Sequence, residues 1–505
     1  MASDEAAEQP LLGIGISGVD DILRGGLPAR CLYLVTGAPG SGKTTLATQF
    51  LLEGVQRGER TLYITLSESR RELSLVARSH GWDTSNIEIC ELIPSERNLS
   101  TEAQLTVFNP SEIELGETTE AIIAAVNDFE PTRVVIDSLS ELRLVAQSTL
   151  RYRRQILALK QFLSGKECTV LLLDDGTGDG SREQLESIAH GVLVLEQLVN
   201  QYGAERRRLR VMKMRGVPFR GGYHDFAIRR GGLDVFPRLV ASEHHTNFPE
   251  NDLPSGNKEL DSLLGGGLPL GTSTLLLGPA GTGKSTIATQ FAVSAAERGE
   301  HAAMYIFDEN FGTFLSRSRK LGIAVEPHIE SGMLTIQQVD PAEMSSGELA
   351  ATVRRAVDGT HGTRARVIVI DSLNGYLNAM PEEKFLTAQL HELLAFLGQQ
   401  GVVTLLSVTQ SGMMGSNMST PVDTTYLADN VILFRYFEAH GHVRRAISVV
   451  KKRSGRHELT IRELTVSDNG LAIGDPLDEF QGILTGVPTF HGDRKSLVER
   501  RRSEH

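Results

Sequence analysis

Short, nearly continuous apolar runs alternate with amphipathic stretches along most of this 505-residue chain. Apolar strands separated by helices are typical of a mainly parallel sheet that is covered by helices on both faces. The runs expected to form strands span residues 31–37, 60–68, 132–138 and 168–175 in the first half, and 273–279, 302–309, 365–372 and 402–410 in the second. The pattern therefore predicts an α/β fold that occurs twice.

The second half of the chain repeats the first. Residues 27–50 and 268–291 align without a gap and are identical at 12 of 24 positions. Other matched landmarks lie at nearly constant separations: 241 residues for Lys43 and Lys284, 234 for Asp137 and Asp371, and 238 for Lys213 and Lys451. Such spacing indicates duplication of a whole domain of about 240 residues. We expect domains over residues 1–245 and 246–490, a linker at about 235–256, and a charged tail over 491–505.

Composition narrows the class of protein. The net charge of −12 disfavours a protein that coats a phosphate backbone, so no nucleic-acid partner is expected. No uninterrupted apolar stretch reaches the roughly 18 residues that span a bilayer, and the N-terminal residues are acidic. We therefore expect a cytoplasmic protein with no membrane segment.

Each half carries the pattern G-x-x-x-x-G-K-[ST], which is called the P-loop below. Its glycines let successive backbone N–H groups surround phosphate oxygens at a helix N-terminus, while the lysine supplies positive charge. The pattern predicts two ATP sites. The residues expected to bind the nucleotide are Gly37, Gly40, Ser41, Gly42, Lys43, Thr44 and Thr45, and Gly278, Gly281, Thr282, Gly283, Lys284, Ser285 and Thr286.

A magnesium site is predicted beside each P-loop. The hydroxyls of Thr44 and Ser285 occupy the position that reaches the metal in this motif. Asp137 and Asp371 each end an apolar strand about 90 residues after the P-loop lysine, which suits the Walker B carboxylate. The alternative is that each aspartate caps the helix that follows.

The strand after each P-loop helix ends in carboxylates: Glu68 in the first half, and Asp308 with Glu309 in the second. A carboxylate at this strand end is placed to orient or deprotonate the group that attacks the γ-phosphate. The alternative is a solvated glutamate, which is common at strand ends.

These motifs, together with the GGLP segments before both P-loops, the IDS strand ends and the K-x-R strands, resemble the KaiC family over residues 14–490. The family consists of double-domain P-loop ATPases, and each half is similar to RecA-like domains. The resemblance implies a homohexamer with ATP between neighbouring subunits. The residues that match family positions reaching across to the adjacent subunit's phosphates are Lys213, Arg215, Lys451 and Arg453. A solvated strand edge is the alternative for them.

The resemblance also implies different chemistry in the two halves. It assigns Glu68 to ATP hydrolysis, and Glu309, together with Asp308, to phosphoryl transfer onto a protein hydroxyl. Alignment through Asp429 places Thr425 as the first phosphoacceptor candidate and Thr424 as the next, with Tyr426 where the clock kinases carry threonine. The alternative is that this segment only packs at a subunit interface.

The motifs and the family resemblance leave three hypotheses for the function of this chain. The leading hypothesis is a hexameric ATPase and autophosphorylating serine/threonine kinase that acts as a signalling or timing switch, with unidentified protein regulators. The second is an ATPase switch or scaffold without kinase activity. The third is a RecA-type DNA-dependent motor, which the acidic composition disfavours.

Overall fold

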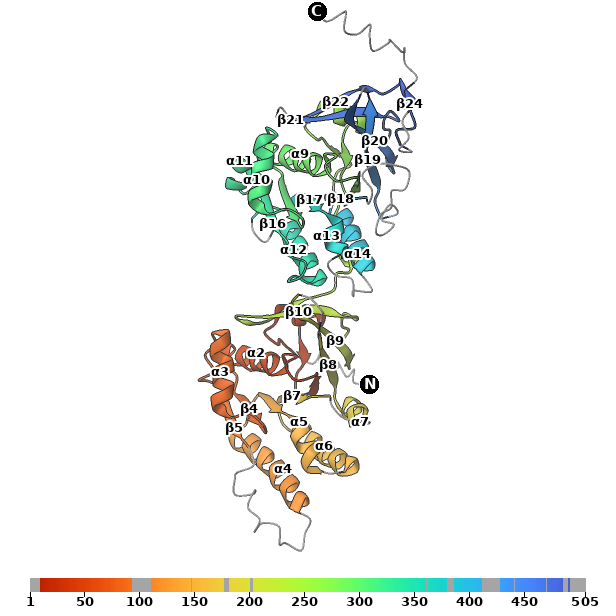
Figure 1. Cartoon of the computed structure of the whole chain (residues 1–505). Helices are drawn as coiled ribbons and strands as arrows, with labels where there is room; N and C mark the ends of the chain where they lie inside the picture. Colours follow the sequence, from red (N-terminus) through yellow and green to blue (C-terminus); the bar gives the residue numbers. More distant parts are fainter. Residues whose placement is uncertain are drawn as a thin grey trace, which may run out of the picture. The chain divides into compact units, whose positions relative to one another are not determined.

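The runs predicted as strands form the parallel centre of two mainly parallel sheets in the computed structural model (Figure 1). The model describes residues 10–92, 110–146, 148–176, 181–199, 203–359, 362–378, 386–410, 427–439, 441–468, 470–484 and 489–490. The chain divides into two compact units, Met1–Arg238 and Leu239–His505. Each is described by itself. The strands of the described main sheet have the same order in the two units, as the internal repeat predicts.

The first unit contains these elements in chain order: β1 (Leu11–Leu12), α1 (Ser17–Ile22), β2 (Leu27–Pro28), β3 (Leu32–Thr36), α2 (Lys43–Gln56), β4 (Thr61–Thr65), α3 (Arg70–His80), β5 (Glu88–Glu91), α4 (Pro110–Phe129), β6 (Arg133–Asp137), α5 (Leu139–Ala146), α6 (Thr149–Ser164), β7 (Thr169–Asp174), α7 (Ser181–Ile188), β8 (Gly191–Leu198), β9 (Arg206–Met214), β10 (His224–Arg229) and β11 (Gly232–Phe236). Within the described residues its main sheet has the order β11-β10-β9-β8-β3-β7-β6-β4-β5. The strands from β8 to β5 are parallel, and β9, β10 and β11 extend the sheet in antiparallel fashion.

The second unit repeats this arrangement: a short 3-10 helix (Ala241–Glu243), β12 (Asp252–Leu253), α8 (Lys258–Leu264), β13 (Leu268–Pro269), β14 (Ser273–Gly278), α9 (Lys284–Glu297), β15 (His301–Ile306), α10 (Phe311–Lys320), α11 (Glu326–Glu330), β16 (Leu334–Gln338), α12 (Ser346–Asp358), β17 (Ala365–Asp371), α13 (Leu373–Asn378), α14 (Leu386–Gln399), β18 (Val403–Thr409), β19 (Asn430–Ala439), β20 (His442–Lys452), β21 (Arg462–Ser467), β22 (Gly470–Pro476), β23 (Phe480–Gln481) and β24 (Thr489–Phe490). Its described main sheet has the order β16-β15-β17-β18-β14-β19-β20-β21-β22. The predicted α/β fold is confirmed in both halves.

The core lies on both faces of each sheet, because the central strands are apolar at successive positions. All five residues of β3 are buried. Leu34 packs into the cluster on one face and Val35 into the cluster on the other, as alternation along a strand requires. The same holds for Leu276 and Leu277 of β14. Burial on both faces explains why these strands appear in the sequence as unbroken apolar runs.

The boundary between the units lies between Arg238 and Leu239, inside the segment 235–256 that was expected to be a linker. That linker prediction is wrong at its start. Val235 and Phe236 are 5% and 3% exposed and end strand β11, so the connection begins after them. Part of the rest is also ordered, since Asp252–Leu253 pairs with Leu268–Pro269.

Parallel strands bring their carboxyl ends to one edge of the sheet. The strand register confirms this for the candidate site residues: Thr65 pairs with Asp137, and Thr36 pairs with Asp174. The P-loop after β3, Glu68 after β4 and the acidic ends of β6 and β7 therefore lie at the same edge. Of the described helices, none combines the length and apolar character needed to cross a membrane.

Candidate nucleotide-binding sites

The first P-loop connects β3 to α2. Gly42 adopts a left-handed conformation with φ of 99° immediately before the helix begins at Lys43. Gly37 has no room for a side chain, since a Cβ there would lie 2.4 Å from the carbonyl oxygen of Leu195. Ser41 and Thr45 are both buried. The glycines of the motif thus allow the turn and the close packing that a phosphate-binding loop requires.

The ammonium group of Lys43 lies inside the loop. Its Nζ donates hydrogen bonds to the carbonyl oxygens of Gly37 at 2.7 Å and Ala38 at 3.1 Å. It also lies 2.9 Å from Oδ1 of Asp175, the residue that follows β7. Burial would raise the pKa of Asp175, but the hydrogen bond and charge of Lys43, with a hydrogen bond from Ser140, hold this pKa below its ordinary value. The sequence motifs give no role to Asp175, although the predicted strand 168–175 ends in two aspartates.

Asp137 lies beside the hydroxyl of the P-loop residue Thr44. Its Oδ2 accepts hydrogen bonds from Thr44 Oγ1 at 3.2 Å and from the hydroxyl of Tyr63 at 2.6 Å. Burial raises the pKa of Asp137, and these two hydrogen bonds oppose that effect. A hydroxyl and a carboxylate that converge in this way are oxygen ligands of the kind that Mg²⁺ prefers. The residues therefore fit a magnesium ion held by Thr44 and Asp137.

Glu68 lies at the same edge of the sheet. Burial raises the pKa of its carboxyl group, with smaller contributions in the same direction from Asp137 and Glu72, while Lys43 lowers it. Its Oε2 is buried and has no hydrogen-bond partner among the described residues. The neighbouring backbone is anchored, because the N–H of Glu68 donates to Thr65 Oγ1 at 3.0 Å. This carboxylate is thus positioned, enclosed and available to accept a proton.

The second P-loop has the same backbone geometry, with Gly283 at φ of 104° before α9. Lys284 Nζ donates to the carbonyl oxygens of Gly278 at 2.9 Å and Pro279 at 2.7 Å. Burial lowers the pKa of Lys284 to about 8, and the charge of Asp371 opposes this shift. Thr282 and Thr286 are buried, and the hydroxyl of Thr282 donates to Pro279. Ser285 and Asp371 stand where Thr44 and Asp137 stand in the first unit.

The two carboxylates after β15 have different partners. Glu309 forms an ion pair with Arg317 of α10, with Arg317 Nη2 2.8 Å from Oε2 and Nε 3.1 Å from Oε1. Asp308 instead accepts a short hydrogen bond from the hydroxyl of Ser372, the residue after Asp371. The structure thus directs Asp308 toward the Walker B strand and Glu309 toward a helix. Arg317 was not identified from the sequence, because its partner depends on how α10 packs.

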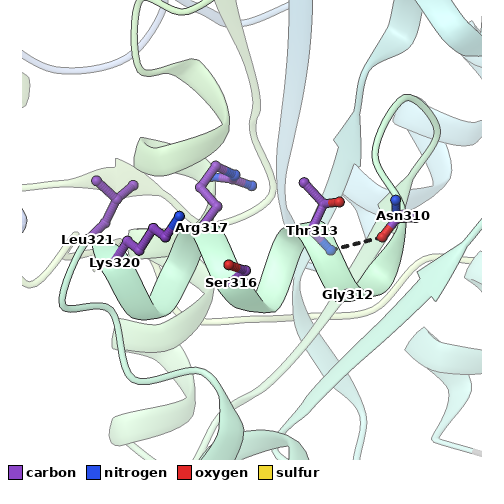
Figure 2. Close-up of a pocket in the computed structure, with 7 residues that line it drawn as sticks. All are labelled: Asn310, Gly312, Thr313, Ser316, Arg317, Lys320 and Leu321. Carbon is purple, nitrogen blue, oxygen red and sulfur yellow. Dashed lines mark hydrogen bonds between the residues drawn. The ribbon is translucent and has the colours of Figure 1, made fainter.

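Figure 2 shows the surface of α10 that follows these carboxylates. A shallow pocket of about 550 Å³ runs along the helix and is lined by Asn310, Gly312, Thr313, Ser316, Arg317, Lys320 and Leu321. Asn310 caps the helix, since its side chain accepts a hydrogen bond from the N–H of Thr313 at 2.8 Å (Figure 2).

A family model described as the KaiC ATPase matches this chain twice, over residues 12–240 and 253–478. The chain belongs to the KaiC family. It is 27% identical to the circadian clock protein KaiC3 of Synechocystis sp., over 97% of this chain and 96% of that protein. It is also 27% identical to the circadian clock oscillator protein KaiC of Synechococcus elongatus, over 96% of this chain and 93% of that protein. The resemblance seen in the motifs is confirmed, and both units are KaiC-type ATPase domains.

The K-x-R residues expected from the KaiC resemblance do not lie beside the P-loop of their own unit. Lys213 Nζ donates to the carbonyl oxygens of Glu186 and Ala189 at 2.7 and 2.8 Å. The N–H of Arg215 donates to His190, whose own N–H donates to Leu32 at the amino end of β3. The P-loop follows the carboxyl end of β3, about 15 Å away at 3.3 Å per residue.

The second unit repeats this placement. Lys451 Nζ donates to the carbonyl oxygen of Ala428 at 2.7 Å, and Arg453 forms an ion pair with Asp429 at 2.9 Å. The N–H of Asp429 donates to Ser273, the first residue of β14. In both units the K-x-R cations therefore lie toward the end of the sheet opposite to their own P-loop. The phosphoacceptor candidates Thr424 and Thr425, and Tyr426, lie outside the described residues.

Proposed function

We propose that this KaiC-family chain is a homohexameric ATPase with ATP between neighbouring subunits. In this proposal the first unit hydrolyses ATP, and the second transfers the γ-phosphoryl group to Thr425 or Thr424. Nucleotide and phosphorylation states would then make the protein a signalling or timing switch. The observation that carries the ATPase proposal is the convergence of Lys43, Thr44, Asp137 and Glu68 at one sheet edge.

In the proposed first site, the P-loop N–H groups and Lys43 hold the phosphates, and Lys43 exchanges Asp175 for phosphate oxygens. A magnesium ion held by Thr44 and Asp137 would neutralise charge on the transferring phosphoryl group. Glu68 Oε2 orients the attacking water and accepts its proton. The raised pKa of Glu68 makes its ionised form a stronger base.

In the proposed second site, we assign the base to Asp308 in preference to Glu309. The hydrogen bond from Ser372 holds Asp308 beside the Walker B strand, whereas both oxygens of Glu309 are engaged by Arg317. This refines the assignment made from sequence resemblance. In the hexamer, the K-x-R cations of one subunit would approach the phosphates of its neighbour, and their position far from their own P-loop supports this arrangement.

Incubation of the full-length protein with γ-labelled ATP and Mg²⁺ tests the kinase part of the proposal. We expect label on the protein that is reduced in Thr425→Ala and abolished in Thr424→Ala/Thr425→Ala, with the modified residue identified by mass spectrometry. Lys284→Ala provides the control, because it removes the lysine of the second P-loop and should also prevent labelling. If no label is transferred while ATP is hydrolysed, the protein is an ATPase switch without kinase activity. The engagement of Glu309 by Arg317 favours this second candidate only where Glu309, which the family resemblance assigns to phosphoryl transfer, is the base.

A further inference from the structure

Two side chains hold the second P-loop from outside. Tyr436 of β19 and Arg445 of β20 are directly opposite each other in the antiparallel pair. The hydroxyl of Tyr436 donates to the carbonyl oxygen of Ala280 at 3.0 Å, and Nε of Arg445 donates to that of Gly281 at 3.1 Å. One cross-strand pair therefore fixes two successive peptide groups of the loop.

Fixing these carbonyl groups also fixes the direction of the N–H groups that bind phosphate. In a planar trans peptide the C=O and N–H bonds point in opposite directions. When the carbonyls of Ala280 and Gly281 are held toward β19 and β20, the N–H groups of Gly281 and Thr282 point to the other side. Successive N–H groups facing one way are what a P-loop presents to phosphate oxygens.

The contact is close enough to require glycine. Gly281 has φ of +76°, and a Cβ built on it would lie 2.8 Å from the hydroxyl oxygen of Tyr436. A side chain at this position would therefore be strained by the backbone conformation and would also displace the tyrosine. The glycine serves the contact with Tyr436 as well as the turn.

The first unit uses the same two positions differently. Tyr33 and Thr274 each lie ten residues before their P-loop lysine, and they pair with Gly191 and Asn430. Gln197 lies six residues after Gly191, and Tyr436 lies six residues after Asn430, so Gln197 and Tyr436 occupy equivalent positions in the two units. On the neighbouring antiparallel strand, Arg207 is opposite Gln197 and Arg445 is opposite Tyr436.

In the first unit both of these side chains bind the same carboxylate. Gln197 Nε2 and Arg207 Nη2 donate to Oε2 of Glu205 at 2.6 and 2.8 Å. This pair is thus tied to Glu205, while its counterpart in the second unit is tied to the P-loop backbone. The two P-loops share a motif but are held by different contacts.

We propose that Tyr436 and Arg445 are positioning residues that hold the second P-loop in its phosphate-binding conformation and slow the release of nucleotide from that site. The inference rests on the proposed binding of ATP by the second unit. It adds a pair of residues, outside the P-loop motif, that controls how long the product ADP stays bound.

The test is the dissociation rate of a fluorescent ADP analogue from the full-length chain, chased with unlabelled ADP. The kinetic phase that Lys284→Ala abolishes belongs to the second site. Tyr436→Phe keeps the ring and removes only the hydroxyl, so we expect this phase to become about two- to tenfold faster, as for the loss of one hydrogen bond. Arg445→Lys, which lacks Nε, should act in the same direction.

Two comparisons separate positioning from general damage. The affinity for adenosine, which has no phosphates, should be unchanged in Tyr436→Phe. Ser262→Ala, which removes a hydroxyl that donates to Glu458 at 2.8 Å in the same unit, should leave the release rate unchanged.

Three outcomes would overturn the inference. If Tyr436→Phe and Arg445→Lys both release ADP at the normal rate, the positioning role is excluded. The proposed nucleotide binding by the second unit would not be affected by that result. Equal weakening of adenosine and ADP binding would show a general structural loss. A wild-type chain with no Lys284-dependent phase would contradict the proposed nucleotide binding itself, and the positioning role with it.

Discussion

Lys43 Nζ lies 2.9 Å from Asp175 Oδ1, so the first P-loop lysine has a carboxylate partner at the position where the γ-phosphate is expected to bind. The second unit lacks this carboxylate. Leu171 pairs with Tyr33, and Leu405 pairs with the equivalent residue Thr274, so Leu171 corresponds to Leu405. Four residues further along each strand, Asp175 therefore corresponds to Thr409. ATP must compete with Asp175 for Lys43 in the first site only.

We therefore expect Asp175→Asn to tighten ATP binding at the first site, by about three- to tenfold for the loss of one partly buried ion pair. Titration with a fluorescent ATP analogue in a Lys284→Ala background measures this affinity. Glu167→Gln is the matched control, since it removes an exposed carboxylate that pairs with Arg30 at the surface of the same unit. Weaker binding in Asp175→Asn would show instead that Asp175 helps to hold the bound nucleotide.

Glu68→Gln should lower ATP turnover by the first unit by about 10²-fold or more, because the amide cannot accept the proton of the attacking water. ATP affinity should change little, since Glu68 is not a phosphate ligand in this assignment. Steady-state hydrolysis in the Lys284→Ala background provides the measurement. Glu167→Gln serves as the control, since Glu167 is an exposed carboxylate of the same unit that pairs with Arg30, and its loss should leave turnover unchanged.

Asp308→Asn should reduce ATP turnover and self-labelling by the second unit more strongly than Glu309→Gln does. The reason is that Ser372 holds Asp308 beside Asp371, while Arg317 engages Glu309. Both variants are best compared in the Glu68→Gln background, where hydrolysis by the first unit is slow. If Glu309→Gln is the more damaging change, the base is Glu309 and the Arg317 pair must open during the reaction.

The same assignment predicts that Arg317→Gln resembles Glu309→Gln. Each variant removes one half of the same ion pair, so both should lower the midpoint of thermal unfolding of the second unit by a similar small amount. Neither should abolish phosphoryl transfer. A strong loss of transfer in Arg317→Gln, with the fold intact, would place Arg317 among the residues that contact the nucleotide.

The first unit should lose stability in acid because of His224. This histidine is fully buried; its Nδ1 accepts a hydrogen bond from the N–H of Arg238, and its Nε2 is 3.0 Å from the carbonyl oxygen of Arg220. Burial lowers its pKa to about 4, while the hydrogen bond to Arg220 opposes the shift. The folded state thus favours neutral His224. Its contribution to the free energy of unfolding is therefore complete above about pH 6.5 and is lost as the pH falls toward 4.

Between pH 6.5 and 4, the free energy of unfolding is expected to fall by about 3 kcal/mol. This follows from roughly 1.4 kcal/mol for each unit by which the pKa of His224 differs between the folded and unfolded states. Urea unfolding followed by fluorescence reports on this unit, because the single tryptophan of the chain, Trp82, lies in it. His224→Gln, whose amide does not titrate, should flatten the pH dependence between 6.5 and 4. An unchanged slope in that variant would assign the acid sensitivity to other groups.

Much of the fold and the centre of each site could be predicted from the sequence. Unbroken apolar runs predict strands buried on both faces, and the structure has a strand at each of the eight predicted runs. The P-loops were also predictable, because glycine spacing acts through local backbone conformation. Asp137 was found for a related reason: the end of a parallel strand places it at the same edge as the P-loop whatever the loops do.

The pairs that distinguish the two sites required the tertiary structure. Lys43 and Asp175, Glu309 and Arg317, and Tyr436 and Ala280 meet only because strand order, register and helix packing bring them together; Tyr436 and Ala280 are 156 residues apart in the chain. The sequence by itself determined two copies of one ATPase domain, since repetition, apolar pattern and glycine spacing are properties of short segments. The tertiary structure decided that the two P-loops are held differently, because a side chain's partner depends on which distant segment packs against it.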